Sequence, residues 1–188
     1  EDDAKMFGDA RRTLIEEASR AALETKVLDE PVTVIVSEKG FLRARSGHGH
    51  DAAAMAFKTG DSLLVSFECR TVDNLIAVGS NGRVYSIAVA QLPSARGDGL
   101  PVTAFIELAP GTQIVGYAGG AADTPLVMAS SAGYGFTCSL GDMVSRQKTG
   151  KAFMTVEEGA QPLWPQVVDK TGDSLVACLS ELGRLLVF

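Results

Sequence analysis

An apolar stretch that runs into a short polar turn ending in glycine, and then resumes as a second apolar stretch, occurs four times along this chain. The segments cover residues 32–46, 75–89, 126–140 and 175–188, and their turn glycines are Gly40, Gly82, Gly133 and Gly183. Glycine adopts the positive φ that a tight chain reversal requires, so each segment is predicted to be a β-hairpin. The Asn81-Gly82 pair further predicts a two-residue type I′ turn, whose central residues both have φ above zero.

The turn glycines are separated by 42, 51 and 50 residues, a period typical of bladed β arrays. Further strands are expected after Gly-Asp or Pro-Gly turns and in shorter apolar runs. They cover residues 62–69, 102–107, 112–117, 152–156 and 161–168, the last irregular because it contains two prolines. The sequence therefore predicts an all-β, propeller-like array of four-stranded blades over residues 31–188, with about 3.5 repeats present. The fourth repeat stops within its hairpin, and we expect the chain to be a fragment of a longer domain.

Residues 1–30 have a different pattern. Thr13 and Glu16 fit a capping box at the start of an apolar helical face, and Pro31 follows the segment. We expect a short helix over residues 9–27 that links this domain to whatever precedes it. This acidic segment has no apolar core of the kind that a signal peptide requires, and nowhere do 18 consecutive apolar residues occur.

Composition refines this picture. Apolar residues make up 46% of the 188 residues but aromatic residues only 6%, so the core must consist mainly of Val, Leu, Ile and Ala. Cys69, Cys138 and Cys178 are far apart and each falls within a predicted strand. Their spacing fits neither a zinc site nor a disulfide framework, and we expect three buried, reduced thiols in a cytoplasmic protein.

The net charge of −6 disfavours a nucleic-acid partner until its distribution is considered. Residues 1–30 carry 5 basic and 9 acidic side chains, whereas residues 31–188 carry 12 and 14. Basic residues gather in the second strand of each hairpin and in the loop that follows, and equivalent loops share one face of a repeat array. The sequence thus predicts a basic rim that contacts duplex DNA without reading its bases. The candidate DNA-binding residues are Arg43, Arg45, Lys58, Arg83, Arg96, Arg146, Lys148 and Lys151.

Other chemistry is poorly supported. His48, His50 and Asp51 are possible metal ligands, but glycines on both sides leave their loop without the rigidity that a metal site needs, so no metal site is predicted. His48 and His50 are the only two histidines of the chain, and no nucleophile elbow accompanies them. No catalytic residues are therefore predicted.

Four short stretches carry a family resemblance: FGDARRT (7–13), LPSARGDG (92–99), MASSAGYGF (128–136) and RQKTGKA (146–152). They occur in register with the repeats and resemble, end to end, the C-terminal domain of the A subunits of bacterial type IIA topoisomerases. The gyrase branch of that family carries a Q-R-R-G-G-K-G box in the first-blade loop, where this chain reads GHGHDAAAMAFKTGD (47–61). That difference favours the topoisomerase IV branch and argues against strong DNA wrapping.

The resemblance implies a β-pinwheel whose basic outer rim binds and bends duplex DNA, and so positions segments for strand passage. It places the DNA-cleaving tyrosine in a preceding core, so this chain alone would not be an enzyme, although the whole protein would be an ATP-dependent isomerase. It implies no cofactor in this chain, because ATP and magnesium would serve the rest of the holoenzyme. The implied partners are the ATPase B subunit and the remainder of the A subunit, in an A2B2 assembly. The protein would be cytoplasmic and nucleoid-associated, with no membrane contact.

An alternative stays open. A protein-interaction propeller without DNA binding would also have blade rims and an open sheet edge, which would then meet a protein partner. Binding that survives nuclease treatment and high salt would distinguish it from a DNA-binding domain.

Overall fold

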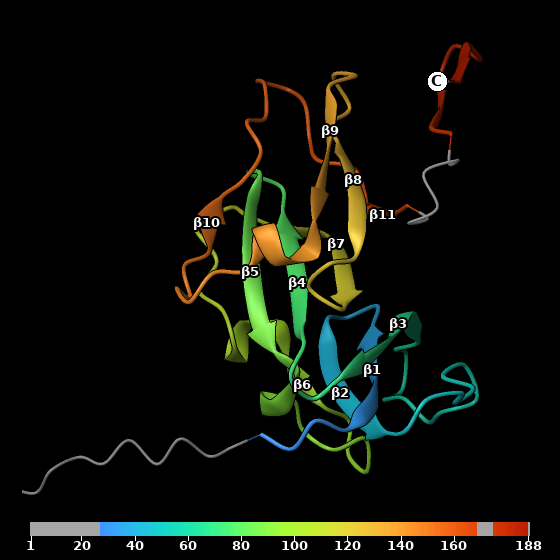
Figure 1. Ribbon diagram of the computed structural model, residues 1–188, viewed down its shortest axis with the longest axis vertical. Helices are drawn as coiled ribbons and strands as arrows, with labels where there is room; N and C mark the ends of the chain where they lie inside the picture. The colour runs from blue at the N-terminus through green and yellow to red at the C-terminus, as the bar shows by residue number, and fades with distance from the viewer. Residues whose placement is uncertain (1–26, 169–174, 188) are drawn as a thin grey trace, which may run out of the picture.

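The computed structural model describes residues 27–168 and 175–187, and nearly all of them lie in strands and loops (Figure 1). The strands form four antiparallel sheets, which we call blades 1 to 4 in chain order. Blade 1 has the strand order β3-β1-β2-β6, blade 2 β10-β5-β4-β7, blade 3 β11-β8-β9, and blade 4 is the hairpin β12-β13. The predicted all-β array with four-stranded blades is therefore confirmed. The bounds of the strands are β1 (Pro31–Ser37), β2 (Phe41–Ser46), β3 (Leu63–Arg70), β4 (Asn74–Gly79), β5 (Arg83–Ala88), β6 (Leu100–Pro101), β7 (Ile114–Gly120), β8 (Pro125–Ala129), β9 (Gly135–Ser139), β10 (Lys151–Ala152), β11 (Gln166–Val167), β12 (Ala177–Leu179) and β13 (Leu185–Val187).

All four predicted hairpins are present, but the turn at Asn81-Gly82 differs from its predicted type. In each turn the glycine N–H donates to the carbonyl oxygen three residues earlier, as Gly82 does to Gly79 at 2.9 Å. Gly82 has a φ of 74°, whereas no described residue other than glycine has a positive φ, so the predicted type I′ turn at Asn81-Gly82 is wrong. A single positive-φ glycine at the end of the turn is typical of a three-residue loop with a bulge. Asn81 instead accepts a hydrogen bond from the backbone N–H of Arg83 on its Oδ1, at 3.1 Å.

Neighbouring blades exchange their outermost strands. β6 follows the hairpin of blade 2 in the sequence, yet it pairs with β2 of blade 1, where Leu100 lies opposite Leu42. β10 follows the hairpin of blade 3 and pairs with β5 of blade 2, where Lys151 lies opposite Val84. The loops that lead into β6 and β10 are therefore brought to the outer edges of blades 1 and 2.

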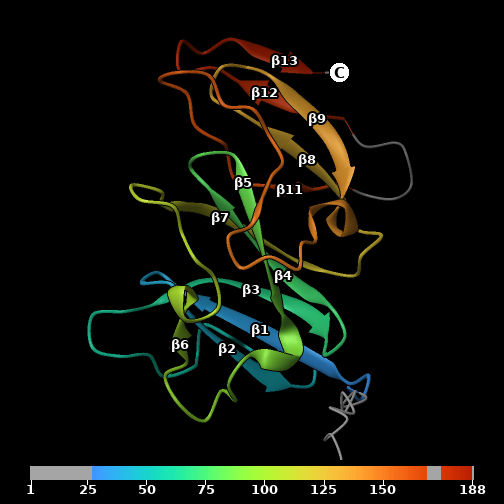
Figure 2. The ribbon, with the colours of Figure 1, turned by 90° about the vertical axis from the view of Figure 1, so that its left-hand side faces the viewer.

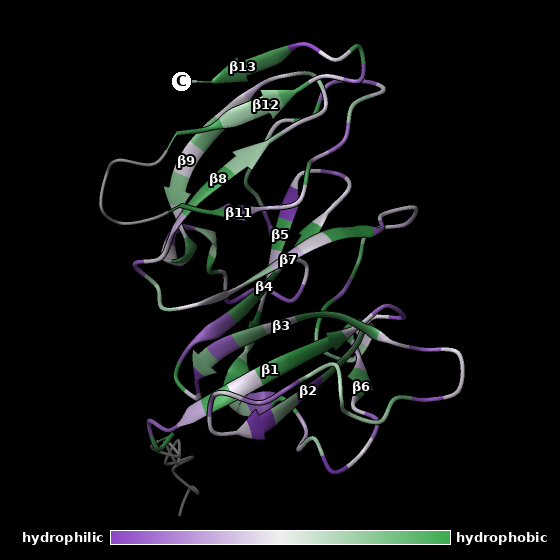
Figure 3. Ribbon diagram, turned by 90° about the vertical axis from the view of Figure 1, so that its right-hand side faces the viewer, coloured by the Kyte–Doolittle hydropathy of each residue, from purple (hydrophilic) through white to green (hydrophobic). Residues whose placement is uncertain are grey.

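Blades 1, 2 and 3 stack face to face in chain order (Figure 2). One apolar cluster fills the space between blades 1 and 2, and a second fills the space between blades 2 and 3. Alternate residues of β4 point to opposite sides: Leu75 and Ala77 pack with β1 of blade 1, and Ile76 and Val78 pack with blade 3. Blade 2 is thus covered on both faces, which explains why β4 is continuously apolar rather than alternating. Figure 3 shows β1 as mostly hydrophobic, while β2 becomes hydrophilic toward its end.

The face of blade 1 turned away from blade 2 is covered by the loop over residues 47–62, which we call the cover loop. Thr33 of β1 donates its hydroxyl to the carbonyl oxygen of Gly47 at 2.8 Å, and Ala52 is buried. Ile35, on the same face as Thr33, is fully buried. A loop therefore takes the place that a neighbouring sheet occupies on blade 2.

Two of the predicted strands are largely wrong. Residues 102–107 begin with the 3-10 turn η2 (Val102–Ala104), in which the N–H groups of Phe105 and Ile106 return to the carbonyl of Val102 and bury the apolar side chains of Val102 and Ile106. Of residues 152–156, Ala152 alone is in a strand, because the next two N–H groups both turn to the carbonyl of Gly82. The 3-10 turns η1 (Val89–Gln91) and η3 (Leu140–Met143) end the hairpins of blades 2 and 3.

Three further expectations have different outcomes. Residues 62–69 and 112–117 are confirmed as β3 and β7, and residues 161–168 shrink to β11. The predicted helix covers residues 9–27, and all of it except Val27 lies outside the described residues, so the helix and the division of the chain at residue 30 stay predictions. Cys69 is buried, which raises the pKa of its thiol to about 12, and Cys138 is half-buried. Cys178 is exposed, as are all the residues of β12 and β13, so its predicted burial is wrong.

Candidate nucleic-acid interface

The two loops that enter the exchanged strands have the same construction, and we call them returning loop 1 (residues 93–99) and returning loop 2 (residues 144–150). Each contains a serine, Ser94 or Ser145, whose side-chain oxygen accepts from the N–H two residues later, at 3.5 and 3.3 Å. Each ends in a positive-φ glycine, Gly99 or Gly150, whose added Cβ would lie 2.5 Å from a carbonyl oxygen of the adjacent strand. Close approach of backbone to backbone therefore fixes both loops against their blades.

Two of the predicted DNA-binding arginines hold these loops. Arg43 of β2 donates to the carbonyl of Gly97 in returning loop 1 at 3.0 Å, and Arg83 of β5 donates to the carbonyls of Thr149 and Gly150 in returning loop 2 at 3.1 and 2.7 Å. Arg43 is only 5% exposed, and Arg83 is half-buried. Their hydrogen bonds order the loops, which limits how far these two guanidinium groups reach toward solvent.

Four other predicted residues have free cationic groups. Arg45 and Arg96 on blade 1, and Arg146 and Lys148 on returning loop 2, are exposed, and their side chains form no hydrogen bond or ion pair with a described residue. These four groups can bind an anion without first breaking an interaction with a described residue.

Lys58 and Lys151 are partly engaged. The Nζ of Lys58 lies 4.4 Å from the ring centre of Phe41 and 3.9 Å from an Asp98 carboxylate oxygen. Lys151 donates to the carbonyl of Asp142 and lies 5.5 Å from the ring centre of Phe153. Both lysines remain close to solvent at the margins of the returning loops.

One of the acidic residues here is held in its charged form. The pKa of Asp142 is below its usual value, first because the Ser139 hydroxyl and N–H donate to its carboxylate at 2.6 and 2.9 Å, and then because Lys151 lies nearby. This carboxylate caps η3 and lowers the positive potential beside returning loop 2.

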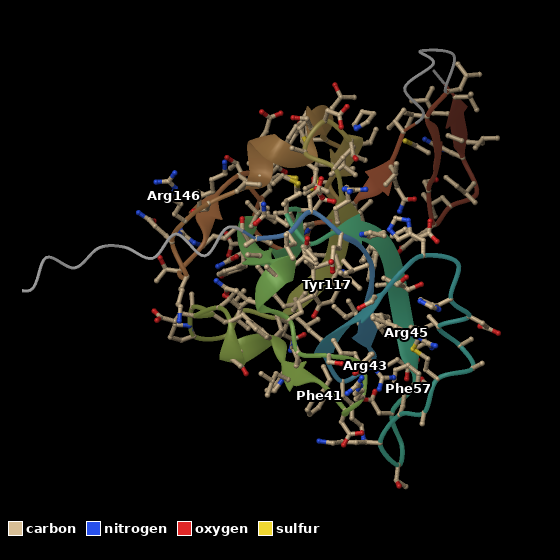
Figure 4. All side chains as sticks on the ribbon, turned by 60° about the horizontal axis from the view of Figure 1, so that its bottom comes forward. Phe41, Arg43, Arg45, Phe57, Tyr117 and Arg146 are labelled. Carbon is tan, nitrogen blue, oxygen red and sulfur yellow. The ribbon has the colours of Figure 1, made fainter. Side chains whose placement is uncertain are left out.

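The eight predicted residues thus form two groups rather than one line. Arg43, Arg45, Lys58 and Arg96 gather around returning loop 1, and Arg83, Arg146, Lys148 and Lys151 around returning loop 2. In Figure 4, Arg43 and Arg45 lie beside Phe57 on blade 1, well separated from Arg146. Because blades 1 and 2 are stacked neighbours, the two groups occupy equivalent outer edges of adjacent blades.

Several residues that shape this surface were missed by sequence reasoning. Phe57 lies 4.6 Å from the guanidinium carbon of Arg43, and Ala56 accepts from that guanidinium through its carbonyl at 2.8 Å. Backbone carbonyl partners have no residue type of their own, so charge and spacing could not identify them. The sequence offered one signal for Phe57: it is the aromatic residue next to Lys58 in an otherwise alanine-rich loop.

The histidines of the cover loop bond to the backbone. His48 Nε2 lies 2.8 Å from the carbonyl oxygen of Cys69, and His50 Nε2 lies 2.8 Å from that of Ser46. Within residues 27–168 and 175–187, no group of three or more potential ligands is arranged to hold a metal ion. Nor does that part of the chain contain a helix long and apolar enough to cross a membrane.

Comparisons with known proteins place this geometry in a family, although no family model matches the chain. Over 99% of its length the chain is 47% identical to the A subunit of DNA topoisomerase 4 from Neisseria gonorrhoeae and 38% identical to that from Escherichia coli K12. It spans about a quarter of the length of each of these relatives.

Solved structures agree with the sequence comparison. The fold matches the Escherichia coli ParC C-terminal domain with a TM-score of 0.78 and 39% identity, over 85% of this chain and 64% of that one. A DNA gyrase A C-terminal domain matches at a TM-score of 0.56 and 19% identity, over 84% of this chain and 54% of the other, which shows a shared fold. This β-pinwheel chain therefore belongs to the family of C-terminal domains of the topoisomerase IV A subunits.

Proposed function

We propose that this chain is a non-catalytic domain that binds duplex DNA through the two returning loops, without reading base sequence. The observation that carries the proposal is a set of exposed cations on equivalent edges of stacked blades, which form no hydrogen bond or ion pair with a described residue: Arg45, Arg96, Arg146 and Lys148. The phosphates of a duplex attract such cations whatever the base sequence, and each contact releases counterions. Contacts of this kind position a duplex but carry no sequence information.

The hydrogen bonds of Arg43 and Arg83 support this role indirectly. Because they hold the returning loops in place, Arg96, Arg146 and Lys148 are presented from ordered backbone, and less conformational entropy is lost on binding. Bending a 20–30 bp duplex costs about 1–6 kcal/mol, so several such contacts must act together to hold a bent segment along the rim.

We infer the wider role from the family. Within the A protein of topoisomerase IV, this domain gathers duplex segments for strand passage, while the cleavage tyrosine belongs to the remainder of that protein. The B subunit of an A2B2 assembly supplies ATP hydrolysis with magnesium. The domain then works in the bacterial cytoplasm, on chromosomal DNA of the nucleoid.

The direct test is fluorescence anisotropy of the chain with a labelled 40 bp duplex over a salt series. We expect binding that ignores sequence and weakens log-linearly with salt, with a slope of about −3 to −4 if four phosphates are contacted. Arg146→Glu should weaken binding about tenfold at 0.1 M salt, because one phosphate contact is lost. Arg184→Glu is the matched control, since Arg184 is also exposed but lies after a hairpin turn, away from the returning loops.

The outcomes are distinct. Equal weakening by Arg146→Glu and Arg184→Glu would show a general charge effect and remove returning loop 2 from the interface. Absence of duplex binding at low salt, together with capture of a protein partner that survives high salt and nuclease, would support the protein-interaction alternative.

A further inference from the structure

A hollow of about 1100 Å³ lies on blade 1 between the cover loop and returning loop 1. Its lining includes three arginines, Arg43, Arg45 and Arg96, together with His50, Asp51 and Asp98. The hollow beside returning loop 2 on blade 2 is smaller, about 310 Å³, and has no arginine at its floor. The residue that corresponds to Arg43, three positions after the turn glycine, is Tyr85, which is fully buried in the core.

Arg43 forms the floor of this hollow and is a buried charge with neutral partners. Its side chain is 5% exposed, and its guanidinium donates to the carbonyls of Gly97 and Ala56 at 3.0 and 2.8 Å. The face of the guanidinium rests on Phe57, at 4.6 Å from the ring centre. It forms no ion pair with a described residue. A buried cation without a counter-ion is unfavourable, so the field in the hollow favours an anion.

Arg45 and Arg96 lie at the sides of the hollow, and backbone hydrogen bonds bring them together. Ala44 N donates to Pro93 O at 2.9 Å, and Ala95 N donates to Ala44 O at 2.8 Å. These bonds align returning loop 1 with the end of β2, so that the residues next in sequence, Arg45 and Arg96, flank the same opening.

The carboxylates of the hollow are already engaged. Asp51 Oδ1 accepts from the N–H groups of Ala53 and Ala54 at 3.1 and 3.4 Å, and Asp98 faces Lys58. His50 is turned to the carbonyl of Ser46. Three arginines and Lys58 against two carboxylates leave the hollow with a net positive charge.

We propose that this hollow is a seat for a single phosphate group. Arg45 and Arg96 donate to its oxygens, and Arg43 acts from below as a positioning residue that orders returning loop 1 and supplies positive charge. The inference rests on the proposed function for the source of the phosphate, which is one phosphodiester of the duplex. Blade 1 then fixes the register of the DNA at one point, while returning loop 2 attracts it less specifically.

The seat is tested without DNA by thermal unfolding in inorganic phosphate and in chloride at equal ionic strength. At about five times its dissociation constant, phosphate should raise the Tm by roughly 2–4 °C. Phosphate also stabilises proteins generally, so variants are essential. Arg45→Gln/Arg96→Gln should lose the added stabilisation, whereas Arg146→Gln/Lys148→Gln, which removes the same charge elsewhere, should keep it. All four side chains are exposed, so both variants should fold, which circular dichroism verifies.

The same variants are then titrated with the 40 bp duplex. Since both arginines hold one phosphate, Arg45→Gln, Arg96→Gln and the double variant should each reduce the salt slope by about 0.9. A double variant that reduces it by about 1.8 would show two separate phosphates and overturn the single seat. Retention of the full phosphate response by Arg45→Gln/Arg96→Gln would overturn it as well. A phosphate response that depends on both arginines, in a wild-type chain that binds no duplex, would keep the phosphate seat and refute the DNA-binding function.

Discussion

Arg43 and Arg45 lie two residues apart on β2, so their side chains leave the same face of blade 1, yet they have different surroundings. The cover loop and returning loop 1 enclose Arg43, while Arg45 lies beyond their margin and is exposed. Charge patterning could predict both as basic, but not which would be used within the protein. That distinction depends on carbonyl groups of Ala56 and Gly97, whose positions are fixed only once residues 54 apart in the sequence have met.

The carboxylate of Asp98 lies where it opposes the binding of phosphate. Asp98 occupies the position of returning loop 1 that corresponds to Thr149 in returning loop 2, one residue before the positive-φ glycine. Its carboxylate faces Lys58 at 3.9 Å and lines the same hollow as Arg45 and Arg96. It therefore repels phosphate and competes for Lys58.

Asp98→Asn should tighten duplex binding by about two- to five-fold at low salt, an effect of the size that exposed ion pairs produce. The gain should shrink as salt increases, because these charges are exposed. Anisotropy titration measures it, and Glu158→Gln is the control, since Glu158 is an exposed acid outside both returning loops. Equal tightening by the two variants would attribute the effect to net charge alone.

At the scale of elements, sequence patterns predicted best the strands that pair with their neighbours in the chain. The four hairpins could be recognised because each apolar pair of strands surrounds a turn glycine. β6 and β10 could not, because each is a two-residue strand whose partner belongs to another repeat. Their pairing depends on strand exchange, and the apolar side chains of residues 102–107 are needed for packing between blades 1 and 2 rather than for a strand. The same exchange sets the returning loops on the rim, so the site was predicted as a set of charges but not as two groups.

Gly150 joins returning loop 2 to β10, and we expect its replacement to loosen this junction. It has a φ of 64°, and a Cβ would lie 2.5 Å from the carbonyl oxygen of Val84 and 2.7 Å from the ring of Tyr85. Gly133, in the turn of blade 3, has a φ of 88° with no atom within 4 Å of its added Cβ. Alanine therefore strains the backbone at both positions but meets a steric clash at one.

Gly133→Ala should cost about 1–2 kcal/mol in the free energy of unfolding, from the left-handed backbone alone. Gly150→Ala should cost roughly 1–3 kcal/mol more, because β10 must move away from β5. Urea unfolding measures both. Gly150→Ala should also weaken duplex binding, since it displaces Arg146 and Lys148, whereas Gly133→Ala should not. Equal destabilisation by the two variants would mean that returning loop 2 is loosely attached to blade 2.

For the whole molecule, the proposed contact with DNA depends on how the blades are stacked. Among the described residues, blades 1 and 2 each carry a cluster of basic side chains at the outer edge. Two contact points always lie on a straight line, so a straight duplex can reach both. A third basic cluster, on a further blade turned relative to the first two, would lie off that line. Only a bent duplex could then contact all three clusters.

Bending should therefore depend on the number of blades that the DNA contacts. With this chain, a 40 bp duplex labelled at both ends should bind while the energy transfer between its labels hardly changes. A chain with a third basic cluster on a further blade should bring the ends closer. In that chain, Arg146→Glu/Lys148→Glu should reduce bending more than affinity, because the remaining groups still bind a straight duplex but no longer offset the roughly 1–6 kcal/mol cost of bending it. Strong bending by the present chain would contradict this account and would require a third cationic contact within residues 1–188.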